Sequence, residues 1–467
     1  MKRETNRVTF SKAESGAERV ARRCRCGVMF LLAVAVSILA FQAYGQQPPA
    51  PTAPLNLNLQ QAVQMALKQN PSVQIAVLNL AESHKDSDIA LSQLLPQADF
   101  NISDRALREN VQANIGIAIP GVPKAVGPFQ VFQVGANFSA PVFDLSLWRK
   151  WQASRKSING ADAQTLSVRE QIVLLVVSQY LSVLRSSAEI SAAQAEVDLA
   201  QALYDQASDQ EKHGTATSVD ELRANVELQN EKQQLIIAQT NEKIALYGLA
   251  KLLNVSPSQQ ITLSDQLTFF ETPNMNVDES LEDAYKSRPE MKQLLAEQQA
   301  LKYEKSSDRD SRLPALTFQG DYEQQGISSS TIIPTYAYIA GISFPIFTGG
   351  RIRAQVVRDE LERKKVDQNL QDEKNQIALE VQTASVQLES ARNQVQVANL
   401  GDELAKEEVQ QSRDRFQAGV ADNIEVVTAQ NSLARADENR IAALYQYNQS
   451  RADLARAIGR IELLYTK

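Results

Sequence analysis

The sequence predicts a mainly α-helical protein with a β-barrel part, in which a duplicated unit combines long antiparallel coiled-coil helices with one β-hairpin per half. Three observations carry this prediction: two matching sets of landmarks, two pairs of alternating segments, and two long stretches without proline. The composition agrees, because only 6% of the 467 residues are aromatic and only 18 are glycine. Such a composition is typical of long helices.

The two halves of the chain repeat the same landmarks in the same order. The first two pairs have an identical offset, since 289 − 71 and 314 − 96 are both 218, and the later pairs are 204 and 205 residues apart. Landmarks that keep their order over about 200 residues indicate one architecture built twice. The pairs are Asn70-Pro71 with Arg288-Pro289, Leu95-Pro96 with Leu313-Pro314, Pro141-Val142-Phe143 with Pro345-Ile346-Phe347, and Gly214 with Gly419.

These landmarks divide the chain into segments. We expect a signal peptide over residues 1–45, an N-terminal linker over 46–60, a first repeat over 61–260, a connector over 261–276 and a second repeat over 277–467. Each repeat contains one hairpin and one helical tip.

The N-terminus has the pattern of a secretory signal. A basic region precedes the apolar run at 28–41, and residues 43–45 are suited to cleavage. An N-terminal anchor helix is the alternative, although the run of about 14 residues is shorter than the roughly 20 that span a bilayer. Both cysteines, Cys24 and Cys26, precede this run, so we expect the processed chain to contain no disulfide and no thiolate metal site.

After each Leu-Pro landmark, apolar residues change from helical spacing to alternation. Apolar and polar side chains then occupy opposite faces, which predicts half-buried strands. We expect strands over about 97–115 and 128–140 in the first repeat, and over about 315–326 and 335–344 in the second. Glycine and proline mark the loop within each hairpin.

Four such strands cannot close into a barrel. In an exported protein, apolar-out and polar-in strands of roughly ten residues fit a transmembrane barrel. Four strands leave open edges and are too few to enclose a lumen, so other copies must complete the wall. Three chains would give twelve strands. Two hairpins lying on a soluble core are the alternative, but the remaining sequence predicts long helices rather than such a core.

The long helices are predicted from two proline-free stretches, residues 144–213 and 351–418. Each would extend roughly 100 Å as one helix. Apolar residues in the second recur every seven positions, at Leu370, Ile377 and Ala384, which favours coiled-coil packing. Returning helices are expected over about 220–254 and 423–459, beyond tips near residues 214 and 419. A soluble coiled-coil adaptor would also use such helices.

The sequence offers little for catalysis or for nucleic acid. A formal charge of −7 gives no electrostatic reason to bind nucleic acid. The two histidines, His84 and His213, are far apart, and neither a phosphate-binding loop nor a nucleophile motif occurs. We therefore expect no enzyme, no cofactor and no metal site.

Together, the Leu-Pro sites, the strand-to-helix junctions and the tip motifs resemble the TolC-like outer membrane factor family over about residues 55–460. These proteins are the exit ducts of bacterial tripartite efflux and secretion systems. The resemblance implies a passive homotrimeric channel, completed as a trimeric 12-stranded barrel in outer membrane lipid and an α-helical tunnel in the periplasm. It also implies a periplasmic adaptor protein and an inner-membrane transporter as partners. A soluble periplasmic coiled-coil adaptor or structural protein is the alternative function.

The resemblance further implies a gate at the periplasmic tip. Glu425 matches the first acidic ring of the family's lumen, Thr428 stands at the position of the second acid, and Asp220 matches the acid contributed by the first half. The family's latching tyrosine and arginine are Phe416 and Ala421 here. We therefore expect a gate that is not latched in the same way.

The same acids have a simpler interpretation. The segments 218–221 and 422–425 have the form of helix-capping boxes, and acids in a first helical turn are stabilised by the helix dipole. Both the gating and the capping roles of Asp220 and Glu425 are therefore open. Gly214 and Gly419 are expected to form tip turns that permit positive φ.

Overall fold

The computed structural model describes residues 54–117, 120–214, 217–269, 276–418, 420–421 and 423–466. The predicted signal peptide over 1–45 and the tip residue Gly419 lie outside the described residues. The described fold is that of one compact unit, Leu55–Lys467.

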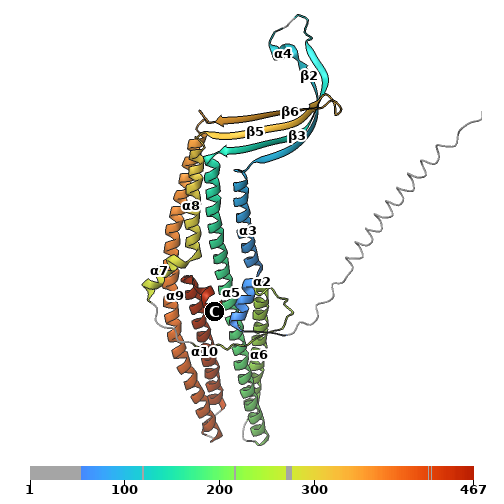
Figure 1. Cartoon of the computed structure of the whole chain (residues 1–467). Coiled ribbons are helices and arrows are strands. Elements are labelled where there is room, and N and C mark those ends of the chain that lie inside the picture. The colour runs from blue at the N-terminus through green and yellow to red at the C-terminus, as the bar shows by residue number, and fades with distance from the viewer. Residues whose placement is uncertain are drawn as a thin grey trace, which may run out of the picture. The chain divides into compact units, whose positions relative to one another are not determined.

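Long helices run from the sheet to two tips and form a layer that is four helices wide (Figure 1). Near the sheet, α3 packs on α5, and α8 lies between α5 and α9. Towards the tips, α6 packs on α5, and α10 lies between α5 and α9. The helices are α3 (Pro71–Ser92), α5 (Leu145–Lys212), α6 (Ser218–Leu252), α8 (Pro289–Asp310), α9 (Arg351–Gln417) and α10 (Asn423–Ala457).

The duplication is visible where a short helix leads into α3 or α8. Helix α2 (Leu59–Gln69) precedes α3, and α7 (Val277–Ser287) precedes α8. The linking residues have nearly the same backbone, with φ −62° and ψ 127° at Asn70 and φ −54° and ψ 126° at Arg288. The following proline fills the first helical position, where no amide hydrogen is needed. The sequence match between these two sites therefore reflects one shared turn.

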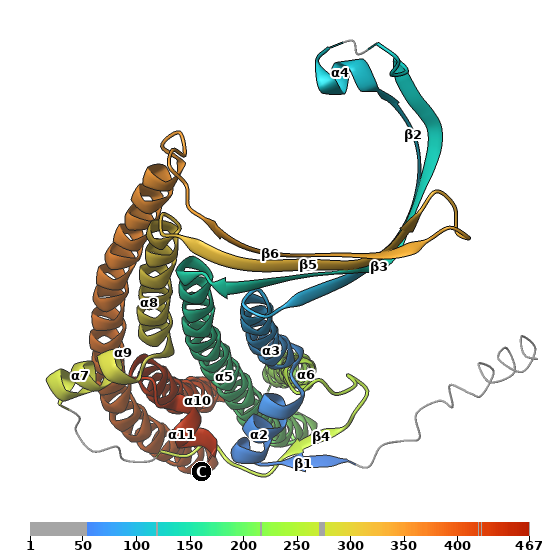
Figure 2. The same ribbon diagram turned by 45° about the horizontal axis from the view of Figure 1, so that its top comes forward.

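The hairpins form one four-stranded antiparallel sheet in the order β2-β3-β5-β6 (Figures 1 and 2). Strands β2 and β6 are its edges, and neither has an outer partner within the described chain. Strand β3 pairs with β5 only from Phe132 onward, so the β2–β3 hairpin extends beyond the β5–β6 hairpin. The strands are β2 (Gln97–Asn110), β3 (Ala125–Phe143), β5 (Ala315–Gly326) and β6 (Ile333–Ser343).

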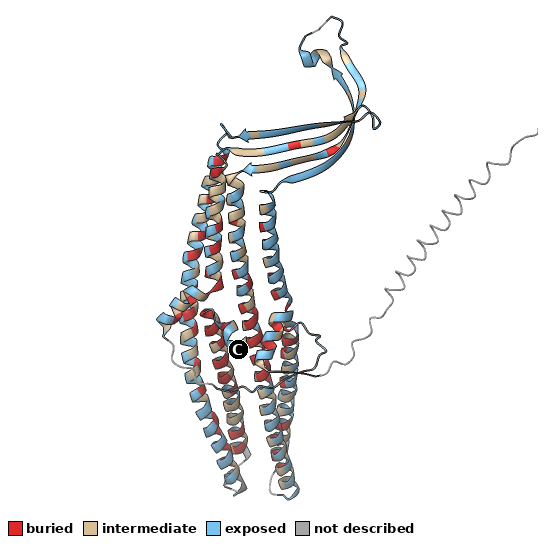
Figure 3. Cartoon of the chain, in the orientation of Figure 1, coloured by how far each residue is buried: buried red, intermediate tan, exposed pale blue. Residues whose placement is uncertain are grey.

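The register separates the sheet into an apolar and a polar face. Phe138 and Tyr338 pair with Gly320 from either side and contact each other's rings at a centroid distance of 6.0 Å. On the other face, Arg105 donates to Gln133, which donates to Glu323 at 3.1 Å. Two glycines are the only buried residues of these four strands, and Figure 3 shows most of the sheet as exposed or intermediate. A single chain therefore covers neither face of its sheet.

Several segment boundaries differ from those expected. The strand expected to reach residue 115 ends at Asn110, whose side chain accepts from the Ala113 amide and caps α4 (Val111–Ile115). Part of the expected linker and part of the expected connector form a parallel strand pair, β1 (Leu55–Leu57) with β4 (Ile261–Leu263). Residues 270–275 of the connector lie outside the described residues. Three-residue strands are too short to produce an alternating pattern that sequence reasoning can detect.

The main core lies at mid-height, where buried side chains gather (Figure 3). It joins α5 to α2, α6, α11 (Ile461–Thr466) and the β1–β4 pair. Tyr180 is fully buried there, and its hydroxyl donates to Asp265 Oδ2 at 2.8 Å. Among the described residues, α5 alone is long and apolar enough to cross a membrane, but half of its most apolar window is buried in the bundle. Its apolar residues are thus explained by packing.

A buried ionic cluster joins the two repeats beside this core. Arg288 is only 4% exposed and donates to Glu290 at 3.0 Å and to Glu380 at 2.6 Å. Glu290 also accepts from Arg456 at 2.5 Å and from Ser167 of α5 at 2.7 Å. The equivalent Asn70 is neutral and makes hydrogen bonds only, to the Ser72 amide and the Leu252 carbonyl. The joint between the short and the long helix is therefore neutral in the first repeat and ionic in the second.

Candidate functional site: the helix tips

The first tip joins α5 to α6 through a tight turn. Helix α5 ends at Lys212, and Gly214 follows with φ 73°, a conformation that strains any residue with a side chain. Helix α6 then begins at Ser218, after the cap residue Thr217. The tip is thus a glycine turn followed by a capped helix.

Asp220 acts as part of that cap. Its Oδ2 accepts from the Thr217 amide at 3.1 Å and from the Thr217 hydroxyl at 2.6 Å. Its Oδ1 lies 3.6 Å from Nη1 of Arg223, one turn further along α6. The hydrogen bonds from Thr217, and then the charge of Arg223, lower the pKa of the Asp220 carboxyl. Asp220 is therefore an anion at neutral pH, and its hydrogen bonds stay within its own hairpin.

At the second tip, Glu425 lies in the first turn of α10 and forms an ion pair with Arg415 in the last turn of α9. Nε of Arg415 lies 3.1 Å from Oε1 of Glu425. The hydroxyl of Thr428 donates to the Ile424 carbonyl at 2.7 Å, within its own helix. The ion pair fastens the two helices of this hairpin together.

Sequence reasoning missed Arg415, because it compared only Phe416 and Ala421 with the family's latch. The side chain of Phe416 lies outside the described residues. The available signal was a basic residue just before the tip turn and an acid just after it. Opposite charges on the two sides of a helical turn are placed to meet when the helices lie antiparallel.

A groove between α6 and α10 brings two of the predicted residues together. Asp220 and Thr428 both line its cavity of about 450 Å³, whereas Glu425 does not. Apolar side chains form much of the wall, and Leu222 is 62% exposed and Ile424 56% exposed. The groove therefore presents an apolar surface edged by charge, on a part of the chain that no described segment covers.

Further from the tip, carboxylates gather between the two hairpins. Burial, and then the neighbouring charges of Glu231, Asp437 and Glu227, raise the pKa of Glu196 to about 7. Burial and Glu227 also raise the pKa of Glu231. Among the described residues, no group of three or more His, Cys, Asp or Glu side chains is arranged to hold a metal ion. This region is therefore negatively charged without forming a metal centre.

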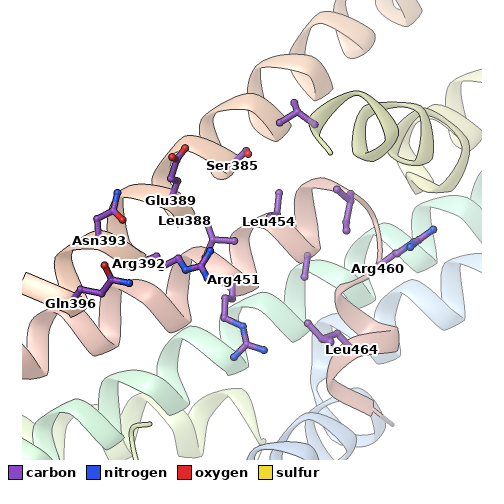
Figure 4. Close-up of a pocket in the computed structure, with 13 residues that line it drawn as sticks. Ser385, Leu388, Glu389, Arg392, Asn393, Gln396, Arg451, Leu454, Arg460 and Leu464 are labelled. Carbon is purple, nitrogen blue, oxygen red and sulfur yellow. The ribbon is translucent and has the colours of Figure 1, made fainter. Parts of the chain in front are cut away.

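A larger cavity, of about 680 Å³, lies at mid-height between α9, α10 and α11 (Figure 4). Leu388 and Leu454 form part of its apolar wall, and Glu389 stands at its side. Arg460 also lines it and pairs with Asp283 of α7 at 2.7 Å. None of the predicted gate residues lines this cavity.

Comparison with known proteins agrees with this architecture. A pyoverdine export outer membrane protein, OpmQ of Pseudomonas putida, is 22% identical over 417 residues, which are 86% of this chain and 85% of that protein. The CmeC outer membrane channel of Campylobacter jejuni superposes with a TM-score of 0.76 at 18% identity, over 86% of both chains. The open-state MtrE outer membrane channel of Neisseria gonorrhoeae gives 0.71 at 18% identity, over 86% of this chain and 89% of that one.

The family model for outer membrane efflux proteins matches residues 62–255 and 280–460, one stretch for each repeat. The predicted fold class, the TolC-like resemblance and the outer membrane location are thereby confirmed. Because the matches cover most of the chain, the protein belongs to the outer membrane efflux protein family: it is an efflux channel of the outer membrane and not an enzyme.

Proposed function

We propose that this efflux channel works as a homotrimer whose twelve strands form one closed barrel. The supporting observation is the sheet itself, which ends in two open edges, β2 and β6, and has one apolar and one polar face. Open edges are not tolerated in lipid, because the unpaired backbone groups find no water there. Joining β6 of one copy to β2 of the next removes every edge.

The helices support the same assembly. Helix α6 carries an exposed apolar stripe on the face opposite its buried residues, and α9 carries another. These helices lie at the two ends of the tip-side helix order α6-α5-α10-α9, so in a ring α6 of one copy meets α9 of the next. The stripes are Ile237 and Ile244 on α6, further from the tip than the groove, and Leu379, Val386, Val397, Leu400 and Leu404 on α9.

Membrane fractionation followed by native mass determination in detergent tests this assembly. We expect an outer membrane species with three times the chain mass. Leu400→Lys places a charge in the α9 stripe and should weaken the trimer. Asn399→Lys places the same charge on an exposed neighbouring residue off the stripe and should not. A monomer in the outer membrane, or equal effects of the two variants, would show that the proposed contact is wrong.

We also propose that the tips gate the channel, with Glu425 contributing one negative charge per copy to its narrow end. A ring of three carboxylates attracts cations and repels anions at a constriction. In planar bilayers, Glu425→Gln should reduce cation selectivity, whereas Glu438→Gln, further along α10, should leave it unchanged. Arg415→Gln distinguishes the carboxylate ring from the Arg415–Glu425 ion pair. It should increase cation selectivity if the three Glu425 carboxylates form a ring. It should also increase the open probability if the ion pair holds the tip closed. Unchanged selectivity in Glu425→Gln would show that Glu425 does not line the constriction.

The partners that we propose are a periplasmic adaptor and, through it, an inner-membrane transporter that selects the cargo. The apolar groove beside Asp220 is the surface that we assign to the adaptor. A photo-crosslinking residue at Leu222 should capture a different protein in cells, whereas one at Leu400 should capture another copy of this chain. Capture of only this chain at both positions would contradict the assignment.

Mass determination of the purified chain addresses the predicted export signal. A chain processed after a signal peptide over about 1–45 has a mature N-terminus that intact mass determination detects. An unprocessed N-terminus would favour the anchor-helix alternative.

A further inference from the structure

Directly beneath the sheet, α8 ends and α9 begins, and a pair of aspartates faces each other across this joint. Asp308 lies in the last turn of α8, and Asp359 lies in the early part of α9. Asp359 is only 1% exposed. Neither residue belongs to the tips or to the ionic cluster around Arg288.

One arginine contacts both carboxyl groups. Oδ1 of Asp359 accepts from Nε and Nη2 of Arg358 at 3.1 and 2.9 Å. The same Nη2 lies 3.7 Å from Oδ2 of Asp308, beyond hydrogen-bond distance. Oδ2 of Asp308 and Oδ2 of Asp359 are both buried, and neither has a hydrogen-bond partner among the described residues. Two acceptor oxygens thus share a desolvated space without a donor.

The surrounding charges do not supply that donor. Towards the pair, α8 contributes Glu304, and α9 contributes Arg351, Arg358 and Glu362. The helix packed on the other side, α5, contributes Arg149, which lies 3.5 Å from Asp310 instead. With the pair itself, four acids face two arginines. The joint is therefore short of positive charge.

A buried acceptor without a donor is destabilising, and two facing carboxylates also repel each other. Adding one proton converts one of them into a donor for the other, which removes both penalties. A metal ion would remove them as well, but no three acidic, His or Cys side chains in the described chain are grouped to ligate one. A single proton, by contrast, needs only the two Oδ2 atoms, one as its donor and the other as its acceptor.

We propose that Asp308 and Asp359 bind one proton between them, and that this shared proton fastens α8 to α9 beneath the barrel. In agreement, burial and then the neighbouring charge of Asp359 raise the pKa of the Asp308 carboxyl. The usual value for Asp in an unfolded chain is about 3.9. A group with a raised folded pKa contributes stability that is full below the unfolded pKa and is lost as the pH rises through the folded one. The joint is therefore tighter in acid and loosens as the pH rises through the raised pKa.

Infrared difference spectroscopy of the full-length protein in detergent tests this proposal. Glu170 and Glu196 also have raised pKa values, so the test is a difference between proteins. The parent should show a protonated-carboxyl intensity that is lost as the pH is raised and that exceeds the intensity in Asp308→Asn. Asp367→Asn is the matched control, because Asp367 lies on the same helix pair but accepts from Gln298 at 2.6 Å and from Arg363 at 3.2 Å. The control should retain the band.

Thermal unfolding gives a second readout. In Asp308→Asn the introduced side-chain amide can donate permanently to Asp359. The unfolding midpoint of this variant should therefore approach that of the parent in acid and exceed it increasingly as the pH is raised. Equal band intensities in the parent and in Asp308→Asn at every pH would overturn the proposal. If EDTA lowers the midpoint of the parent but not of Asp308→Asn, a divalent cation bridges the pair and the shared proton is wrong.

Discussion

Replacing Arg288 by methionine tests how strongly the buried ionic cluster stabilises the second repeat. The substitution keeps an apolar stem of similar length and removes the guanidinium. Glu290 would then keep Arg456 and Ser167, and Glu380 would keep its bond from Gln376 at 2.9 Å. Removing one partner of a buried ion pair typically costs 3–5 kcal/mol. Because Glu380 is 36% exposed and Glu290 retains one arginine, we expect a loss near the lower limit, about 3 kcal/mol.

The matched control is the equivalent position in the first repeat. Asn70→Ala removes a helix cap and should cost about 1 kcal/mol. Urea unfolding of the detergent-solubilised protein, followed by circular dichroism, should therefore rank the midpoints as parent, Asn70→Ala, Arg288→Met. Adding Glu380→Leu to Arg288→Met should restore part of the loss, because it removes the carboxylate that lost its partner.

The result that would refute this reasoning is a loss in Arg288→Met no larger than that in Asn70→Ala. The cluster would then be a set of solvent-screened charges rather than a buried joint.

Three further predictions concern the sheet, the core and the first tip. A Cβ on Gly320 would lie 2.5 Å from the Phe138 ring, whereas one on Gly341 would meet its nearest atom at 3.8 Å; Gly320→Ala should therefore reduce the yield of outer membrane trimer on seminative gels, and Gly341→Ala should not. Burial raises the pKa of the Glu170 carboxyl to about 7, and Arg456 offsets this only in part. The protonated carboxyl therefore stabilises the fold fully below about pH 4.3, and this contribution is lost as the pH rises through about 7. The unfolding midpoint of Glu170→Gln relative to that of the parent should rise over this range, and a difference that does not change with pH would contradict the prediction. Asp220→Ala should increase amide hydrogen exchange at residues 217–222, and unchanged exchange would show that its cap is dispensable.

Much of the fold could be predicted because its signals are local and repeated. Prolines mark both short-helix turns, alternation marks all four long strands, and the long proline-free stretches became α5 and α9. The ends of the strands were harder to predict than the strands themselves. Nothing in the sequence around Asn110 ends the strand there; the end is set by its side chain, which caps α4. The β1–β4 pair joins residues more than 200 positions apart, and neither strand carries a pattern of its own.

The site was predictable only in part. The predicted capping box over 218–221 is one residue late: Thr217 is the cap residue, and Asp220 rather than Glu221 closes the box. Arg288 was noticed only as a landmark, because its partner Glu380 lies 92 residues away and no local pattern connects them. The charges at Asp308 and Asp359 looked like ordinary solvated helix residues until packing buried them.

The unequal reach of the two hairpins shapes the outer mouth of the channel. Between its start and Phe132, β3 pairs with β2 alone and not with β5. Around the proposed ring of three copies, tall and low hairpins would alternate, and the rim would be notched rather than level. The tall arms lie above the pairing that closes the wall. Their length and sequence can therefore diverge under pressure from the surroundings of the cell, while the conduit beneath them stays intact.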